Sequence, residues 1–230
     1  MPEVSESSRS RFAPRSANDL TDLVRANPLA WLASSADGRF LASPLPLLPV
    51  VADDGRLTSL IGHFARANPQ LAMIERDPRA LALFLGDHGY ISASWLHDRT
   101  QAPTWNYASA CFTVDVVLQP GPDAAHAAIE LLVNAMEEGR PTRWRIDEMG
   151  ARYQRLLNGV VAFEAKIVET HARFKLGQDE RDDVYADIVA AVTAGGAAPL
   201  LEWMQRFNPT RAQVESADAS DAESTGVDSP

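Results

Sequence analysis

The feature that most constrains this chain is a series of short apolar segments joined by tight turns. Residues 29–34 alternate as a half-buried strand does, and Asp37-Gly38 is typical of a two-residue hairpin turn. A second strand is expected over 39–51, where three prolines favour an edge or a bulge, and a third over 57–64. Parallel strands need long crossover connections, and strands do not alternate regularly with helices here. The sheet is therefore expected to be antiparallel.

The rest of the chain combines long strands with helical segments. A continuous apolar run over 79–85 predicts a buried strand that continues toward Ser94. Further strands are expected over 104–118 and 160–174, and helices over 17–26, 68–76, 123–138, 147–157, 182–193 and 198–207. This order predicts a β-barrel with α-helical additions, an α+β fold.

The expected domain organisation is one domain with appendages at both ends. At 230 residues the chain is long enough for one large core. Residues 1–16 are expected to form a mobile arm and 17–207 the folded domain, with a helical insertion at 123–157 and C-terminal helices at 182–207. Residues 208–230 are acidic and poor in apolar residues, so a disordered tail is expected there.

Composition limits the classes of function. The net charge of −10 makes direct DNA binding doubtful, because phosphate contacts need a basic face. The histidines lack metal-site spacing and Cys111 is the single cysteine, so no metal is expected. No apolar run is long enough to cross a membrane, and the first residues do not resemble a secretory signal. A cytoplasmic location is therefore expected.

Three segments share a character that indicates a ligand cleft. Residues 61–70 read as a strand that ends in a helix start, where free backbone N–H groups and the helix dipole attract an anion such as a phosphate. Residues 89–96 and 102–107 are rich in aromatic and hydroxyl side chains at strand ends. Together the three segments predict one lined cleft.

Four ordered motifs carry a resemblance to a known family. They are Gly62-His-Phe-Ala-Arg-Ala-Asn-Pro-Gln70, Tyr90-Ile-Ser-Ala-Ser-Trp95, Pro103-Thr-Trp-Asn-Tyr107 and Phe174-Lys-Leu-Gly-Gln178. Over roughly residues 20–192 the chain resembles the PaiB-like family of FMN-binding negative transcriptional regulators. The resemblance implies an antiparallel FMN-binding split barrel of six strands, which forms a homodimer and holds FMN at the subunit interface.

The resemblance and the chemistry of the side chains together give a set of expected FMN-binding residues. Cations, hydroxyls and a helix start suit the phosphate, whereas aromatic rings and amides suit the isoalloxazine ring. The expected residues are His63, Phe64, Ala65, Arg66, Asn68, Ser92, Ser94, Trp95, Thr104, Trp105, Asn106, Tyr107, Lys175 and Gln178. The late motif departs from the family's Lys-Leu-Ser-Gln-Asn at Gly177 and Asp179, which removes two side chains able to act as ligands.

Purely structural roles for the same residues remain alternatives to the functional ones. Trp95, Trp105 and Tyr107 are equally suited to a core or a dimer interface, and a strand-end histidine such as His63 is often satisfied by a backbone carbonyl. Three functions also stay open. They are a flavin-dependent regulator, an FMN-dependent oxidoreductase acting on a small planar molecule, and a flavin- or haem-binding module. The sequence identifies no general base.

Overall fold

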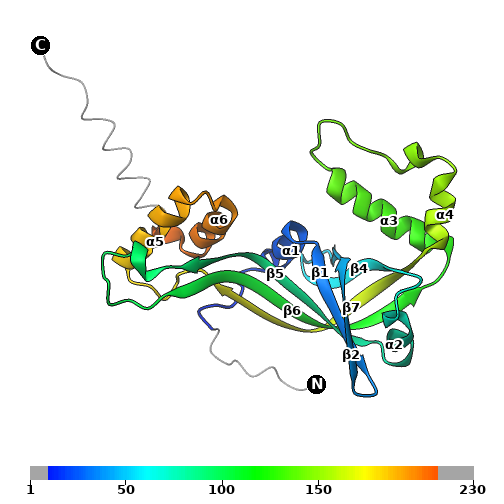
Figure 1. Ribbon diagram of the computed structural model, residues 1–230, viewed down its shortest axis with the longest axis horizontal. Helices are drawn as coiled ribbons and strands as arrows, with labels where there is room; N and C mark the ends of the chain where they lie inside the picture. Colours follow the sequence, from blue (N-terminus) through cyan, green and yellow to red (C-terminus); the bar gives the residue numbers. More distant parts are fainter. Residues whose placement is uncertain (1–9, 212–230) are drawn as a thin grey trace, which may run out of the picture. The chain divides into compact units, whose positions relative to one another are not determined.

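The computed structural model describes residues 10–211 (Figure 1). The chain divides into two compact units, each made of separate segments. Within the described range, unit 1 comprises residues 10–15, 87–108 and 173–211, and unit 2 comprises 16–86 and 109–172. No helix in this range is long and apolar enough to span a membrane.

The elements follow the order expected from the sequence, with most boundaries within two residues. The helices are α1 (Ala17–Ala26), α2 (Gln70–Arg76), η1 (Ala93–Trp95), α3 (Pro122–Glu137), η2 (Ile146–Met149), α4 (Arg152–Asn158), α5 (Asp182–Ala194) and α6 (Ala198–Phe207). The strands are β1 (Leu29–Ala36), β2 (Arg39–Pro46), β3 (Leu48–Val51), β4 (Leu57–Ala65), β5 (Arg79–Ile91), β6 (Thr104–Gln119) and β7 (Val160–Lys175).

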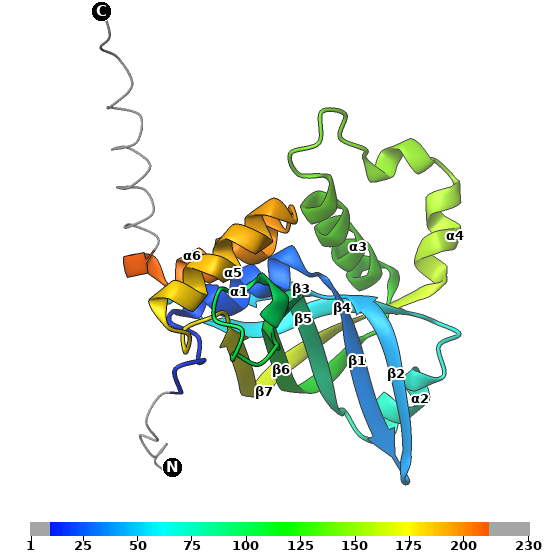
Figure 2. The same ribbon diagram turned by 60° about the vertical axis from the view of Figure 1, so that its left-hand side comes forward.

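The strands form one seven-stranded antiparallel sheet in the order β2-β1-β5-β6-β7-β4-β3. The first hairpin is the one that the sequence predicts, because Asp37 and Gly38 both have positive φ and join β1 directly to β2. Figure 2 shows this hairpin, with α2 beside it. The antiparallel β-barrel with helical additions is therefore confirmed.

The prediction of a single strand over 39–51 is wrong. The chain breaks at Leu47, whose N–H donates to the carbonyl of Pro28 instead of to a neighbouring strand. The residues before the break pair with β1, and those after it pair with β4. Pro46 and Pro49 flank the break and lack backbone donors, so one continuous ladder cannot form. The sheet consequently has seven strands and not six.

Two further expectations need correction. The run 79–85 is not buried on both faces, because alternate residues of β5 from Arg79 to Leu85 are exposed. Residues 147–157 do not form one helix, because the backbone turns at Gly150 with a φ of 55° and separates the short η2 from α4. Local apolarity indicated that a strand and a helix form in these segments. It did not predict which face of the strand is exposed or where the helix is interrupted.

Unit 2 has its core between the sheet and the helices α1 and α2. Ser16 is the N-cap of α1, and its backbone N–H donates to the Asp19 carboxylate at 2.8 Å. Gln70 of α2 is fully buried and donates to the Leu32 carbonyl at 2.8 Å and to the Ser34 hydroxyl at 2.9 Å. These hydrogen bonds tie α2 to β1.

Unit 1 is built around the end of β7 and the helices α5 and α6. Phe174 and Phe207 are fully buried, and their rings stack with centroids 4.9 Å apart. Residues outside the expected limits of the domain also take part. The Phe12 carbonyl accepts from the Phe174 N–H at 2.8 Å, and the buried Asn208 amide donates to the Leu176 carbonyl at 3.0 Å. Packing therefore starts before residue 17 and continues past 207, while residues 1–9 and 212–230 of the expected arm and tail lie outside the described range.

Candidate functional site

The residues expected to bind FMN fall into two groups, one in each unit. The first group lies in unit 1 on β6, η1 and the end of β7, and the second lies in unit 2 on β4 and the turn that follows it. The unit 1 group comprises Ser92, Ser94, Trp95, Thr104, Trp105, Asn106, Tyr107, Lys175 and Gln178. The unit 2 group comprises His63, Phe64, Ala65, Arg66 and Asn68.

A lysine and a threonine form the polar centre of the unit 1 group. The Lys175 ammonium donates to the Thr104 hydroxyl at 2.6 Å and to the Trp105 carbonyl at 3.4 Å. An ammonium has three donors, so one is left for a further acceptor. Lys175 is only partly buried, and its charge is accessible to an anion. The end of β7 thus places a cation beside the start of β6.

An exposed aromatic cluster lies next to this lysine. The Trp105 ring is 53% exposed and contacts the Tyr90 ring edge-on, with centroids 5.7 Å apart. His88 lies at 6.2 Å from the same indole. Trp95 of η1 is also exposed, and Tyr107 is half-buried. Rings of this size are usually buried, so their exposed faces provide stacking area for a planar molecule.

The hydroxyl-rich segment of the same unit forms a compact turn. The Ser92 hydroxyl accepts from the Ser94 N–H at 3.2 Å, and the two hydroxyls lie 2.7 Å apart. Arg99 donates to the Ser94 carbonyl at 3.1 Å and so fixes the end of η1. One hydroxyl donates to the other, so the pair keeps one O–H donor and further acceptor capacity for a ligand. The turn therefore holds two hydroxyls ready for a polar ligand.

Two expected ligands of unit 1 point inward instead. The buried Asn106 amide nitrogen faces the Met204 sulfur at 3.6 Å, and its oxygen has no hydrogen-bond partner within residues 10–211. Gln178 accepts from the Leu176 N–H at 2.6 Å and donates to the Phe174 carbonyl, which closes a turn in its own segment. The fold therefore uses the Gln178 amide fully but leaves the buried Asn106 oxygen without a partner among residues 10–211, and the binding roles of both residues stay predictions.

The departure at Gly177 has a local cause. Its φ is 86°, and a Cβ at this position would lie 3.0 Å from the ring of Tyr185. Tyr185 is itself buried and belongs to α5. A serine side chain here would need the tyrosine to shift. Glycine at 177 and tyrosine at 185 thus fit each other.

The unit 2 group uses its polar side chains within the turn. Arg66 donates from Nε to the Asn158 carbonyl at 3.0 Å and from Nη2 to the Val160 carbonyl at 3.1 Å. Asn68 donates to the Ser43 hydroxyl and accepts from the Gln70 N–H, both at 2.9 Å. A hollow of about 420 Å³ lies here, lined in part by Ala65, Asn68 and Ser43. It has no cation in its lining, and α2 has only seven residues.

The other members of this group serve the core. Phe64 is fully buried against Phe163, with ring centroids 4.8 Å apart. Burial lowers the pKa of His63, which favours the neutral imidazole and weakens its attraction for a phosphate. Within the described part of the chain, no three His, Cys, Asp or Glu side chains are grouped to hold a metal ion.

Sequence reasoning missed members of the exposed cluster. Tyr90 lies in a quoted motif and His88 two residues before it, yet neither was expected to act. The available signal was the spacing of the two residues, because positions i and i+2 of a strand share one face. Arg99 was also missed, and nothing in its loop sequence pointed to the Ser94 carbonyl.

The antiparallel sheet and its helical additions form a split barrel, and the exposed aromatic and cationic surface is its candidate ligand site. Residues 8–169 match the family described as "Putative FMN-binding domain". The chain belongs to this family, the PaiB-like FMN-binding proteins, and FMN is the cofactor that the membership assigns. The matched range ends before Lys175 and Gln178.

One curated relative and two solved structures illustrate the similarity. The chain is 28% identical over 180 residues to "Protease synthase and sporulation protein PAI 2" of Bacillus subtilis (strain 168), covering 77% of this chain and 84% of that protein. A FAD and heme binding protein from Mycobacterium smegmatis has a TM-score of 0.54 at 22% identity, covering 77% of this chain and 78% of that one. The flavocytochrome Anf3 from Azotobacter vinelandii has a TM-score of 0.55 at 16% identity, with 76% and 75% covered. At these identities the two structures support the fold alone.

The residues of unit 1 fit a flavin mononucleotide. Lys175 has one donor left for a phosphate, Ser92 and Ser94 supply hydroxyls in the same unit, and Trp105 is an exposed aromatic residue. When bound, FMN supplies redox chemistry that no side chain of the protein can. The protein's own part is to bind and orient it.

Proposed function

We propose that the protein works as a homodimer that binds FMN at the interface between its two copies, as a flavin-responsive regulator in the cytoplasm. The observation that supports the homodimer is an exposed apolar sheet face in unit 2. Trp31 of β1 is 53% exposed and lies directly opposite Leu83 of β5 in the strand register. Leu81 and Leu85 share the face with Leu83 and are also exposed. A contiguous exposed apolar surface of this kind marks an interaction site.

The charges on this face favour a second copy of the chain as its cover. Arg79 continues the exposed row of β5, and it forms an ion pair with Asp115 of β6 at 2.7 Å. The face therefore carries one cation and one anion side by side, without net charge from this pair. Two copies related by a twofold axis can meet there without repulsion, since each presents the same neutral apolar surface.

Regulation is proposed to act through a partner and not through direct contact with DNA. The first turn of α5 carries Asp182 and Asp183, and the preceding Arg181 is held by Asp98 and Asp183. A DNA-reading helix needs free basic side chains at this position. Binding of flavin would instead change the structure of the dimer, and this change would alter how the dimer binds its partner.

A second candidate function is a redox or haem-binding protein of the same fold. It is favoured by the two similar structures, one of a FAD and heme binding protein and the other of a flavocytochrome. The exposed Trp105 and Tyr90 rings suit any planar ligand. The absorbance spectrum of the purified protein separates flavin from haem, and bleaching of bound flavin by NAD(P)H would favour an oxidoreductase.

Light scattering on a matched pair of variants tests the dimer. Leu83→Glu places a charge in the apolar face and should give a monomer, since an unpaired charge is costly to bury. Leu131→Glu is the control, because Leu131 of α3 is exposed to a similar degree but lies away from β1 and β5. Dimers for both variants, or a monomeric wild type with full FMN affinity, would refute the interface.

Titration with FMN and riboflavin tests the cofactor site. Lys175→Gln should weaken FMN binding about tenfold or more, through loss of one charge-assisted hydrogen bond, and leave riboflavin binding nearly unchanged. Lys166→Gln is the control, because Lys166 is exposed in the middle of β7. Equal binding of FMN and riboflavin to the wild type would show that the phosphate is not recognised.

A further inference from the structure

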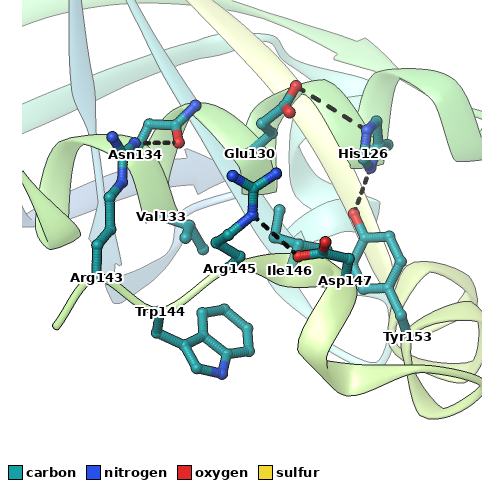
Figure 3. Close-up of a pocket in the computed structure, with 10 residues that line it drawn as sticks. All are labelled: His126, Glu130, Val133, Asn134, Arg143, Trp144, Arg145, Ile146, Asp147 and Tyr153. Atoms are coloured by element: carbon teal, nitrogen blue, oxygen red, sulfur yellow. Dashed lines mark hydrogen bonds and ion pairs between the residues drawn. The ribbon is translucent and has the colours of Figure 1, made fainter.

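A cavity of about 440 Å³ lies in the helical insertion of unit 2, between α3 and residues 143–153 (Figure 3). This volume lies within the usual range for small-molecule sites. None of the residues expected to bind FMN lines it. The cavity is therefore a separate feature of the protein that the flavin does not explain.

The floor of the cavity is apolar and firmly packed. Val133, Ile146 and the Tyr153 ring line the cavity and also pack on a small core of the insertion. That core consists of Ala125, Ile129, Leu157 and Val160. A site with such a floor is held by the fold and does not depend on a bound ligand for its shape.

The charged side chains around the floor do not all cancel. Arg145 and Asp147 form an ion pair at 3.3 Å and neutralise each other. Arg143 donates to the neutral Asn134 amide at 2.5 Å and has no carboxylate partner among residues 10–211. Glu130 has His126 as its nearest partner, at 4.0 Å, and an imidazole is charged only when protonated. The Arg143 guanidinium and the Glu130 carboxylate can therefore pair with charged groups of a ligand.

The two remaining charges are presented from one face of α3. Glu130 and Asn134 are at positions i and i+4 of α3, so they are neighbours on the helix surface. Because Asn134 holds the Arg143 guanidinium, the cation is held at the same face as the carboxylate. In an α-amino acid, the carboxylate and the ammonium are adjacent groups, so one ligand can offer a partner to each of these two charges.

We propose that the cavity binds a free α-amino acid with an aromatic or large apolar side chain. Arg143 binds the carboxylate and Glu130 binds the ammonium, while the side chain lies on Val133 and Ile146 beside the Trp144 ring. The Trp144 backbone N–H donates to Glu137 at 3.0 Å, which fixes the segment that carries the indole. Figure 3 shows these side chains together with the Arg145–Asp147 ion pair, which also lines the cavity.

The hydrogen bond between His126 and Tyr153 supports the anionic end of the site. The Tyr153 hydroxyl lies 2.6 Å from Nδ1 of His126. Burial and the nearby Glu130 raise the pKa of Tyr153, so its hydroxyl stays protonated beside the imidazole. The other ring nitrogen, Nε2, lies 4.0 Å from the Glu130 carboxylate, which is too far for a hydrogen bond, so the carboxylate oxygens can accept from an ammonium.

Calorimetry of the full-length protein with three probes tests the proposal. L-Phenylalanine should bind with one site per chain. L-Phenylalaninamide lacks the carboxylate and N-acetyl-L-phenylalanine lacks the ammonium, and each should bind about five- to tenfold more weakly because both anchors are solvent-exposed. No saturable binding of L-phenylalanine up to about 10 mM would overturn the proposal.

Two variants assign the anchors. Arg143→Gln should weaken L-phenylalanine and abolish its advantage over the amide, and Glu130→Gln should abolish its advantage over the N-acetyl derivative. Arg155→Gln is the matched control, since Arg155 is an exposed arginine of α4 that does not line the cavity. If Arg143→Gln and Arg155→Gln behave alike, the carboxylate is not bound at Arg143 and the proposal fails. The probe comparison on the wild type does not depend on the folding of any variant.

Discussion

Arg66 and Lys175 are two cations that the sequence assigns to the same flavin phosphate, and the structure uses them differently. Arg66 of unit 2 donates to two backbone carbonyls, those of Asn158 at the end of α4 and Val160 at the start of β7. Lys175 of unit 1 donates to the Thr104 hydroxyl and the Trp105 carbonyl and retains one donor. The difference is one of anchoring, because Arg66 uses two of its five N–H donors on backbone carbonyls, whereas Lys175 uses two of its three donors on a hydroxyl and a carbonyl.

The largest effect on stability should come from replacing a closely packed strand glycine with alanine, and each unit has one such glycine. A Cβ at Gly62 would lie 2.7 Å from both Leu47 and Phe163, which are fully buried, whereas a Cβ at Gly89 meets only the tip of Leu200. Gly62→Ala should lower the free energy of unfolding by about 1–3 kcal/mol, as overpacked cores do. Gly89→Ala should lower the free energy of unfolding by less, and thermal unfolding of both variants measures the difference. Equal losses would mean that unit 1 is packed as tightly as unit 2.

A pair of truncations tests how far unit 1 extends. Ending the chain at Phe207 removes Asn208, which donates to the Leu176 and Met204 carbonyls, and Arg211, which donates to the Gly177 carbonyl. This truncation should cost about 1–2 kcal/mol of stability, whereas ending the chain at Arg211 should leave the melting temperature unchanged. If the longer truncated chain also melts early, residues after 211 contribute to the fold.

Arg66→Ala tests the internal role of the turn directly. Loss of the two hydrogen bonds to the Asn158 and Val160 carbonyls should lower the free energy of unfolding by about 1 kcal/mol. The ratio of FMN to riboflavin affinity should not change, in contrast to Lys175→Gln. A selective loss of FMN binding in Arg66→Ala would reverse the comparison and place the phosphate at the turn.

The smallest effect concerns pH. The folded-state pKa of His63 lies below the ordinary value of 6.5, so the unfolded chain binds the proton more readily. The contribution of neutral His63 to the free energy of unfolding is therefore fully present above about pH 6.5, and it is lost as the pH falls through the folded-state pKa. Melting temperatures between pH 5 and 8 should show a shallower acid decline for His63→Gln. Parallel curves for the two proteins would assign the decline to other groups.

Local patterns predicted most of the fold. The turn at Asp37-Gly38 needed two residues that tolerate positive φ, and apolar periodicity located each helix and long strand. What failed depended on distant partners. Leu47 ends β2 because its N–H finds the Pro28 carbonyl, and β5 exposes Leu83 because nothing within the described chain covers that face.

The candidate site was predictable in residue type and not in orientation. Trp105 and Lys175 were expected to face a ligand, and their exposure is compatible with that role. Asn106 and Gln178 belong to the same motifs but are turned inward by Met204 and by the Phe174 carbonyl. A strand position selects one of two faces, and which face meets the core depends on packing that a single motif does not encode.

The division of the chain has a consequence for its synthesis. The chain passes from one unit to the other after residues 15, 86, 108 and 172, and the last three of these points lie inside β5, β6 and β7. A ribosome releases the chain from its N-terminus, so unit 2 has all its segments once residue 172 has emerged. Unit 1 is complete only after α5 and α6 have been synthesised, although its segment 87–108, which includes Trp105, is made much earlier. The nascent chain therefore carries exposed aromatic residues through much of its synthesis, and no single proteolytic cut can separate the two units intact.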